Sequence, residues 1–111
     1  MTDAMDLLQG TLDVLVLRTL RGGAMHGYAV SRAIRDRTRG ELEIDYAPLY
    51  KALHRLARAG CVSAAWGISE SGRRARYYSL TARGRERLRD EEKAWRRYAS
   101  AVFRVLDPTE A

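Results

Sequence analysis

The chain has 111 residues and one cysteine, carries a formal net charge of +6 and has a pI of about 10.0. This length favours a single domain with a core of modest size, and it makes dimerisation a common way to bury more surface. The absence of an apolar run of about 18 residues and of a basic leader excludes a membrane span, and together with the lone Cys61 it favours a cytoplasmic location.

The first predicted helix begins at Gly10 and Thr11, after a short arm formed by residues 1–9. Apolar side chains recur along one stripe of this helix, and more lie on its other side. The stripe consists of Leu12, Leu15, Val16, Thr19 and Leu20, and the other side carries Val14 and Leu17. A helix that is apolar on two faces needs two partners, so we expect it to pack against its own core and against a second subunit.

The second predicted helix spans about 28–37 and follows a connector that contains His26. We expect His26 to hold this connection rather than to act as an acid, a base or a metal ligand, because no second ligand stands at a useful spacing. Beyond the helix, residues 41–44 alternate between polar and apolar side chains, which predicts a very short strand.

The third predicted helix spans 45–59, with Asp45 as its N-cap and Gly60 at its end. Its inner stripe consists of Leu49, Ala52, Leu53 and Leu56, and its outer arc consists of Tyr50, Lys51, His54, Arg55 and Arg58. The outer arc contains no carboxylate. Two interpretations are open: an ordinary amphipathic helix with hydrated basic residues, or a surface that binds an anionic polymer.

Two extended runs, 61–66 and 75–80, surround a polar loop that contains glycines, which predicts a β-hairpin. Thr81 then caps a last helix over about 82–106. The order of elements predicts a mainly α protein with a small β-hairpin, in the α+β class. We expect a winged helix-turn-helix over 8–81 and a C-terminal dimerisation helix over 82–107. That helix should pack with the first helix of a partner subunit, and the two parts should form one structural unit.

A winged helix-turn-helix places its third helix in the major groove of DNA, with the N-terminal residues of that helix nearest the bases. The candidates for DNA contact are therefore Tyr46, Tyr50, Lys51 and, at the margin, His54. Arg58 lies too near the C-terminal end to read bases. Tyr50 has an alternative role as a partly buried core aromatic. The expected partner is a double-stranded DNA operator.

The predicted hairpin loop is the second basic site, with Arg73, Arg74 and Arg76 close together in the chain. A hairpin tip with glycines and arginines can follow the phosphate backbone or enter a minor groove. The alternative is an ordinary hydrated turn. Because the charge has one sign there, apart from Glu70, the pattern favours phosphate contact.

The last predicted helix has apolar residues every seven positions, at Leu88, Trp95 and Val102, which is typical of a coiled-coil seam between two subunits. The alternative is a helix that folds back on its own domain as part of the core. We favour the seam because the helix is long and the domain is small. The expected dimer contacts are Leu12, Val16, Leu88, Trp95, Val102, Val105 and Leu106.

No grouping of residues in the sequence indicates catalysis or a bound cofactor. There is no nucleophile with histidine and acid partners, no phosphate-binding glycine loop and no carboxylate pair in an apolar frame. We therefore expect neither enzymatic activity nor a metal or other cofactor.

Five stretches of the chain resemble the PadR family of transcriptional regulators. They are LQGTLD at 8–13, HGY at 26–28, LYKALHRL at 49–56, WG at 66–67 and GRRARYYSLT at 72–81. The resemblance implies a winged-helix homodimer that usually represses transcription and releases DNA when it senses a ligand. It also adds Tyr28, from the HGY motif, to the expected DNA contacts.

The single C-terminal helix resembles the short branch of that family. In a multidrug-sensing member of the branch, an aromatic residue on this helix stacks on flat ligands between subunits, and Trp95 matches it in position. The resemblance thus implies a small aromatic or hydrophobic effector at Trp95, with Leu15 and Tyr98 beside it. The alternative is that Trp95 only anchors the dimer interface.

Two residues depart from the family pattern at the base-reading end of the third helix. Pro48 and Lys51 stand where a small hydroxyl residue and a proline are often found, so the operator sequence of relatives cannot be carried over. A function of a different class is a winged-helix module that binds an acidic partner protein through the basic arc. The wing motif and the lack of carboxylates on the arc favour DNA.

Overall fold

The computed structural model describes the backbone of residues 4–107 and the side chains of residues 10–107. Its elements are α1 (Ala4–Leu20), β1 (Met25–His26), α2 (Gly27–Arg37), α3 (Tyr46–Arg58), β2 (Val62–Ile68), β3 (Arg74–Leu80) and α4 (Ala82–Leu106). The strands form one antiparallel sheet in the order β1-β3-β2. The predicted α+β class, with a winged helix-turn-helix and a long C-terminal helix, is confirmed.

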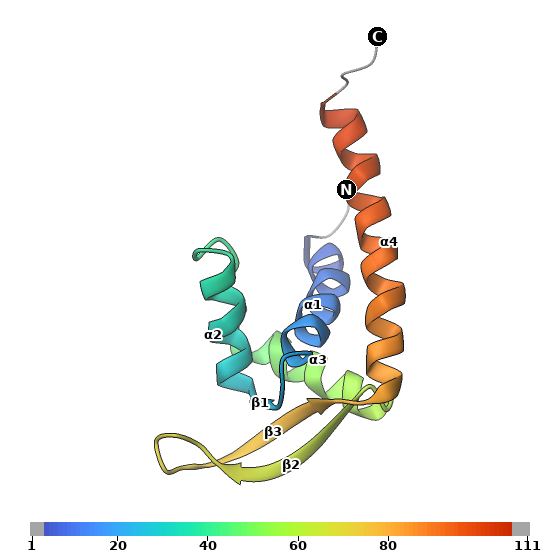
Figure 1. The fold of residues 1–111 in the computed structure, drawn as a ribbon. Coiled ribbons are helices and arrows are strands. Elements are labelled where there is room, and N and C mark those ends of the chain that lie inside the picture. The colour runs from blue at the N-terminus through green and yellow to red at the C-terminus, as the bar shows by residue number, and fades with distance from the viewer. Residues whose placement is uncertain (1–3, 108–111) are drawn as a thin grey trace.

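The helices α1, α2 and α3 lie together beside the sheet, and the β2-β3 hairpin projects beyond α2 (Figure 1). Helix α4 begins at the opposite end of the hairpin and extends alongside α1 (Figure 1). Its distal part continues past the other elements. Among residues 4–107, no helix is long and apolar enough to cross a membrane.

The core lies where α1, α2 and α3 meet the sheet, and it contains the inner stripe of α3 as predicted. Its buried residues include Leu12, Val16, Leu17, Leu20, Val30, Ile34, Leu49, Ala52, Leu53, Leu56, Cys61, Val62 and Tyr78. Leu17, on the side of α1 expected to face a second subunit, is fully buried in this core. The half-buried Val14 and Leu15 form the outward side of α1 instead.

The predicted start of the first helix is wrong. Helix α1 begins at Ala4, so residues 4–9 are helical rather than an arm, and the remaining residues 1–3 of that arm lie outside the described residues. No proline interrupts the stretch. A single glycine inside a helix costs only about 1 kcal/mol relative to alanine, so the helix continues through Gly10.

The predicted strand at 41–44 is also wrong, because these residues form an irregular segment. Ile44 instead anchors the segment by burying its side chain in the core. The third strand of the sheet is β1, whose two residues pair with Tyr78 and Tyr77 of β3. The free edge of β3 is therefore covered by the connector before α2 and not by the segment before α3.

The first half of α4 packs in the protomer's own core, which corrects part of the expected dimer surface. Leu88 and Leu12 are each 2% exposed, and Val16 is fully buried, so these side chains are not available to a partner. The other expected dimer contacts, Trp95, Val102, Val105 and Leu106, are exposed. The alternative, a helix that folds back on its own domain, thus applies to the first half of α4, and the seam between subunits stays a prediction for the exposed half.

A close approach at Gly84 fixes the start of α4 against the turn after α3. Thr81, the predicted cap, accepts a hydrogen bond from the Gly84 N–H through Oγ1 (3.0 Å) and donates its hydroxyl to the Gly60 carbonyl (2.6 Å). A Cβ at Gly84 would collide with the carbonyl oxygen of Cys61 and lie 2.8 Å from Cδ1 of Leu80. Any larger residue there must push α4 away from the turn.

We expect Gly84→Ala to lower the free energy of unfolding by about 1–3 kcal/mol, the usual cost of overpacking. Gly10→Ala is the matched control, because a Cβ at Gly10 meets no atom within 4 Å. It should raise the free energy of unfolding by about 0.5–1 kcal/mol, since alanine suits a helix interior better than glycine. Urea denaturation followed by circular dichroism measures the free energy of unfolding of both variants. Equal changes in the two variants would contradict a close approach at Gly84.

Candidate nucleic-acid interface

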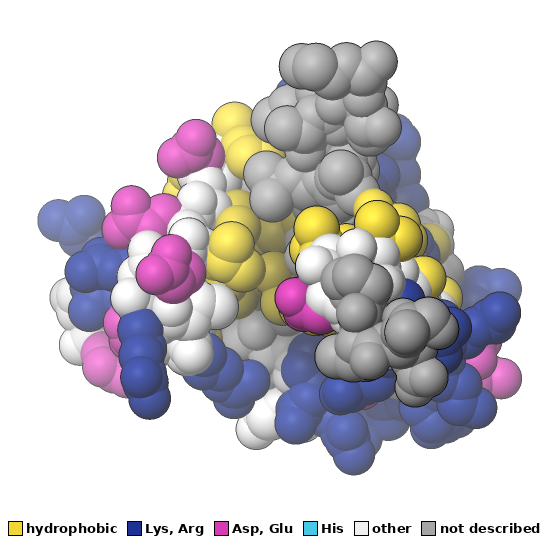
Figure 2. Space-filling view, turned by 90° about the horizontal axis from the view of Figure 1, so that it is seen from above, with side chains coloured by type: hydrophobic (Ala, Val, Ile, Leu, Met, Phe, Trp, Pro, Cys, Tyr) yellow, Lys and Arg dark blue, Asp and Glu magenta, His cyan; other side chains and the backbone are white. Residues whose placement is uncertain are grey.

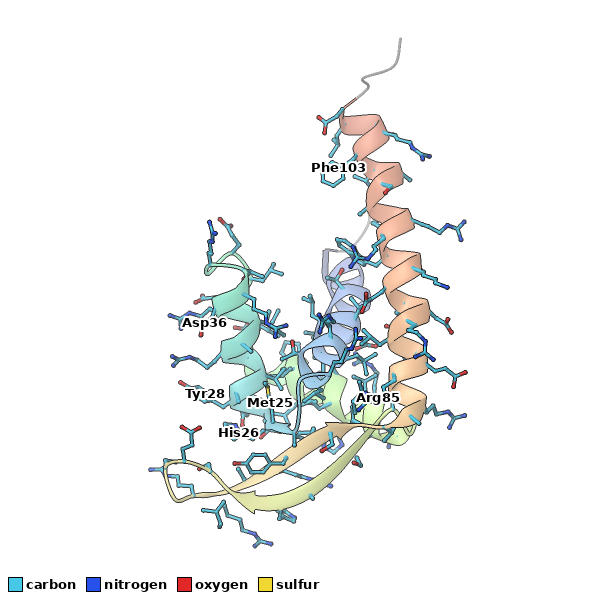
Figure 3. All side chains as sticks on the ribbon, viewed as in Figure 1. Met25, His26, Tyr28, Asp36, Arg85 and Phe103 are labelled. Carbon is cyan, nitrogen blue, oxygen red and sulfur yellow. The ribbon has the colours of Figure 1, made fainter. Side chains whose placement is uncertain are left out.

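An open groove of about 950 Å³ lies between the start of α2, the start of α3 and the β2-β3 hairpin. Every expected DNA contact lines this groove except Lys51, which is exposed on α3 but outside the lining. The lining contacts are Tyr28, Tyr46, Tyr50, His54, Arg73, Arg74 and Arg76. Figure 3 shows His26 and Tyr28 at the base of α2, next to the hairpin. The fold therefore joins the basic helix and the basic loop in one surface.

Helix α3 enters the groove with its N-terminal end. Asp45 occupies the N-cap position as predicted, with extended backbone angles (φ −65°, ψ 153°), but its side chain makes no capping hydrogen bond. The predicted N-cap position of Asp45 is therefore correct, but the expected capping hydrogen bond between its carboxylate and the helix is absent. The first backbone N–H groups of a helix have no partner within the helix, so this end suits an anion such as phosphate.

Two tyrosines one turn apart form a hydrogen-bonded pair at this end of α3. The phenol oxygens of Tyr46 and Tyr50 are 2.5 Å apart, and their rings meet edge to face with centroids 4.3 Å apart. Tyr50 is half-buried and Tyr46 is exposed, and both line the groove. Tyr50 is not part of the hydrophobic core. The hydrogen bond with Tyr50, with burial as a smaller cause, raises the pKa of Tyr46 to about 12. The Tyr46 phenol therefore keeps its proton to a higher pH than an ordinary tyrosine does.

The hairpin carries the basic residues on the other side of the groove. Its turn is closed by hydrogen bonds from the Ser69 N–H to the Arg73 carbonyl (2.7 Å) and from the Gly72 N–H to the Ser69 carbonyl (2.8 Å). Gly72 has φ +79°, a conformation that glycine adopts without strain. Arg73 therefore lies at the turn, and Arg74 begins the strand that forms the groove wall.

Arg32 and Trp66 are two of the groove residues that the predicted site lacked, and both make contacts with its predicted residues. The Arg32 guanidinium donates a hydrogen bond from Nη1 to Oη of Tyr28 (2.9 Å), and the four-residue spacing of this pair on a helix is a signal that could have revealed it. Trp66, which the sequence offered only as part of a motif, lies under the guanidiniums of Arg74 and Arg76. That contact depends on strand register, which the sequence alone did not define.

His26 holds the connection before α2, as predicted. Its Nδ1 accepts a hydrogen bond from the Ala29 N–H (3.1 Å) and so caps α2, and its ring meets that of Tyr77 edge to face at 5.4 Å. Within the described part of the chain, no group of three or more His, Cys, Asp or Glu side chains could hold a metal ion.

Arg55 pairs with a carboxylate of another helix and does not line the groove, which corrects the interpretation of the outer arc. Its Nη2 lies 2.8 Å from Oδ1 of Asp13 on α1, and Nη2 of Arg87 on α4 lies 3.5 Å from Oδ2 of the same carboxylate. The Asp13 side chain is only 14% exposed. The carboxylate missing from the arc is thus supplied by another helix.

A second, smaller cavity of about 170 Å³ lies between α1 and α4. Two of the expected ligand contacts, Leu15 and Trp95, line it together, and the Trp95 indole donates a hydrogen bond from Nε1 to Oγ1 of Thr11 (3.2 Å). The third, Tyr98, is 52% exposed and does not line the cavity. The walls are mostly apolar and sit beside the exposed half of α4.

Comparisons with known proteins agree with this geometry. The model of the transcriptional regulator PadR-like family matches residues 16–90. An uncharacterized protein of Lysinibacillus sphaericus is 31% identical over 90 residues, which cover 81% of this chain and 83% of that protein. A PadR family transcriptional regulator from Eggerthella lenta has a TM-score of 0.77 and 30% identity, over 96% of this chain and 89% of that one. A transcriptional regulator from Clostridium thermocellum has a TM-score of 0.79 and 27% identity, over 91% of this chain and 95% of that one.

We expect Asp13→Ala to lower the free energy of unfolding by about 1–3 kcal/mol, because it leaves Arg55 and Arg87 without their shared carboxylate. The matched control is Glu43→Ala, since Glu43 pairs with Arg35 at 3.7 Å and both side chains are more than half exposed. An exposed pair contributes about 0–1 kcal/mol. Thermal denaturation of both variants measures the difference. A smaller loss for Asp13→Ala than for Glu43→Ala would show that the cluster does not hold the helices together.

Proposed function

Since this chain belongs to the transcriptional regulator PadR-like family, whose members are DNA-binding regulators and not enzymes, we propose that it is a dimeric repressor. In this proposal a small aromatic or hydrophobic ligand releases it from its operator. One observation carries the DNA-binding part: the groove joins the N-terminal end of α3 with the arginines of the hairpin. A helix end that reads bases and a basic wing that holds phosphate form a complete DNA-binding surface.

The proposed contacts divide by chemistry. Tyr46, Tyr50 and His54 line the groove at the start of α3 and would face base edges, with Lys51 at the margin. The hairpin residues Arg73, Arg74 and Arg76, together with Tyr28 of α2, would hold the backbone. Because phosphate contacts carry no sequence information, the tyrosine pair is where operator choice would reside.

The distal half of α4 supports the dimer. Its apolar side chains include Val102, Phe103, Val105 and Leu106, which are 37%, 59%, 79% and 66% exposed. The ring of Phe103 projects from the same side of α4 on which α1 lies (Figure 3). In the view from above, hydrophobic side chains gather toward the middle of the face, and Lys and Arg prevail along its lower and right-hand edges (Figure 2). The occupant that we propose for this strip is a second copy, whose recognition helix would lie about 34 Å away.

The cavity between α1 and α4 supports a ligand site that is completed by dimerisation. Its volume of about 170 Å³ in one protomer is below the roughly 300–1,000 Å³ of most small-molecule sites. It lies beside the proposed dimer strip, so the second copy would enlarge and close it. Leu15 and the Trp95 ring suit a planar apolar ligand, and Tyr98 would face that ligand from the partner's side of the strip.

We expect binding to the gene's own upstream region to weaken with salt, by a slope of about −0.9 in log K against log [salt] for each neutralised phosphate. The double variant Arg73→Ala/Arg74→Ala should make that slope shallower by about 1.8 and weaken all duplexes alike. The matched control is Arg89→Ala, because Arg89 is an exposed arginine of α4 outside the groove. It should change neither the salt slope nor the affinity for duplex DNA. Fluorescence anisotropy over a salt series measures the slopes.

Two outcomes of that titration would count against the proposal. Equal affinity of the wild type for its upstream region and for random duplex would exclude a sequence-specific regulator. Capture of an acidic protein from nuclease-treated lysate, with no duplex binding, would favour the protein-interaction module instead.

We expect Val105→Asp to convert the dimer to a monomer, because a charge replaces an apolar side chain in the proposed strip. Ser100→Asp is the matched control, since Ser100 is exposed on the opposite side of α4. Sedimentation velocity at several concentrations measures both masses. A dimer that survives Val105→Asp, or a wild type that is monomeric at all concentrations, would exclude this interface.

A further inference from the structure

We propose that Trp66 is a positioning residue for DNA binding, which holds the guanidiniums of Arg74 and Arg76 ready for phosphate. The inference rests on the proposed DNA-binding function of the groove. It deepens that function by assigning a task to an exposed aromatic residue that the fold does not otherwise need.

The strand register places these three side chains on one face of the hairpin. Trp66 of β2 stands opposite Arg76 of β3, and Arg74 lies two residues along the same strand. The Arg74 guanidinium carbon lies over the indole at 4.5 Å from its centroid, and that of Arg76 at 5.8 Å. The same face continues inward to Tyr78, which is 4% exposed in the core.

Trp66 itself does not stabilise the core. It is 59% exposed and lines the groove, whereas the hairpin is held by its backbone ladder and by Tyr77 on the other face. The Tyr77 ring covers Gly67, and a Cβ at Gly67 would lie 2.9 Å from that ring. The Tyr77 hydroxyl donates a hydrogen bond to the Ile68 carbonyl (3.1 Å). Because the strand is already held in place, the exposed indole offers a rigid surface on which the guanidiniums can lie.

A guanidinium over an aromatic ring keeps its in-plane N–H donors free at its edge, where phosphate oxygens can accept them. The contact also removes side-chain freedom before DNA arrives, so less is lost on binding. Such restraint matters in this groove because Asp36 and Glu70 also line it. Without the indole, Arg74 and Arg76 are free to turn toward those carboxylates.

Trp66→Leu and Trp66→Phe form a matched pair, because both keep an apolar side chain but only phenylalanine keeps a π face. We expect Trp66→Leu to weaken binding to upstream and random duplexes alike, by about fivefold to thirtyfold for two cation–π contacts. The salt slope should stay at the wild-type value, because the same phosphates are still contacted. Trp66→Phe should recover most of the loss.

A double-mutant cycle separates positioning from a general effect on the hairpin. Combining Trp66→Leu with Arg74→Ala should cost less than the sum of the single losses, since both remove the same contact. Combining it with Arg73→Ala should be additive, because Arg73 lies at the turn and is not among the arginines over the indole. Thermal denaturation of each variant reports whether it is folded.

Several results would overturn this inference while leaving the proposed function intact. They are wild-type affinity for Trp66→Leu, equal losses for the leucine and phenylalanine variants, additivity with Arg74→Ala, and a shallower salt slope. If Trp66→Leu does not fold, the phenylalanine variant and its cycle with Arg74→Ala decide the matter. If the wild type binds no duplex, the proposed function fails and the positioning role fails with it.

Discussion

The Asp13 carboxylate of α1 joins this helix to α3 and α4, and α3 is the helix whose N-terminal end lines the candidate interface. It pairs with Arg55 of α3 at 2.8 Å and with Arg87 of α4 at 3.5 Å, and Glu91 pairs with Nε of the same Arg87 guanidinium at 2.7 Å. The hydrogen bond with Glu91 raises the pKa of Arg87, which favours the charged guanidinium. Because Asp13 is largely sheltered from water, its charge depends on these two arginines for compensation.

This cluster holds one half of α3 and leaves the other half at the groove. The C-terminal half of α3 is held by Arg55 and by the turn that contacts the start of α4. The N-terminal half is free to present the tyrosine pair to the groove. The cavity between α1 and α4 lies beside the same cluster, since its residues Val14 and Glu92 adjoin Asp13 and Glu91 in the chain.

Local patterns predicted the elements that local forces determine. The 3.6-residue period of α3, the Thr81 cap of α4 and the glycine-containing loop of the hairpin all appear in the structure where the sequence placed them. Three local predictions failed: the start of the first helix, the strand at 41–44 and the capping hydrogen bond of the Asp45 side chain. The remaining failures involve partners that are distant in the chain. Asp13 is 42 residues from Arg55, so the arc looked free of carboxylates. Likewise, the contacts of Trp66 follow from the pairing of β2 with β3, and the burial of Leu88 follows from the packing of α4 on the domain.

The most direct test of the central claim, that the groove is the DNA-binding surface, is site-specific photo-crosslinking. The photoreactive residue p-benzoylphenylalanine would replace Tyr46 in the groove, Ser71 at the hairpin turn, or Ser100 on distal α4. Each protein would be irradiated with its upstream duplex after a gel shift has shown binding. The account predicts crosslinked DNA from positions 46 and 71 and none from position 100. Binding without crosslinks at 46 and 71, or with equal crosslinks at 100, would contradict it.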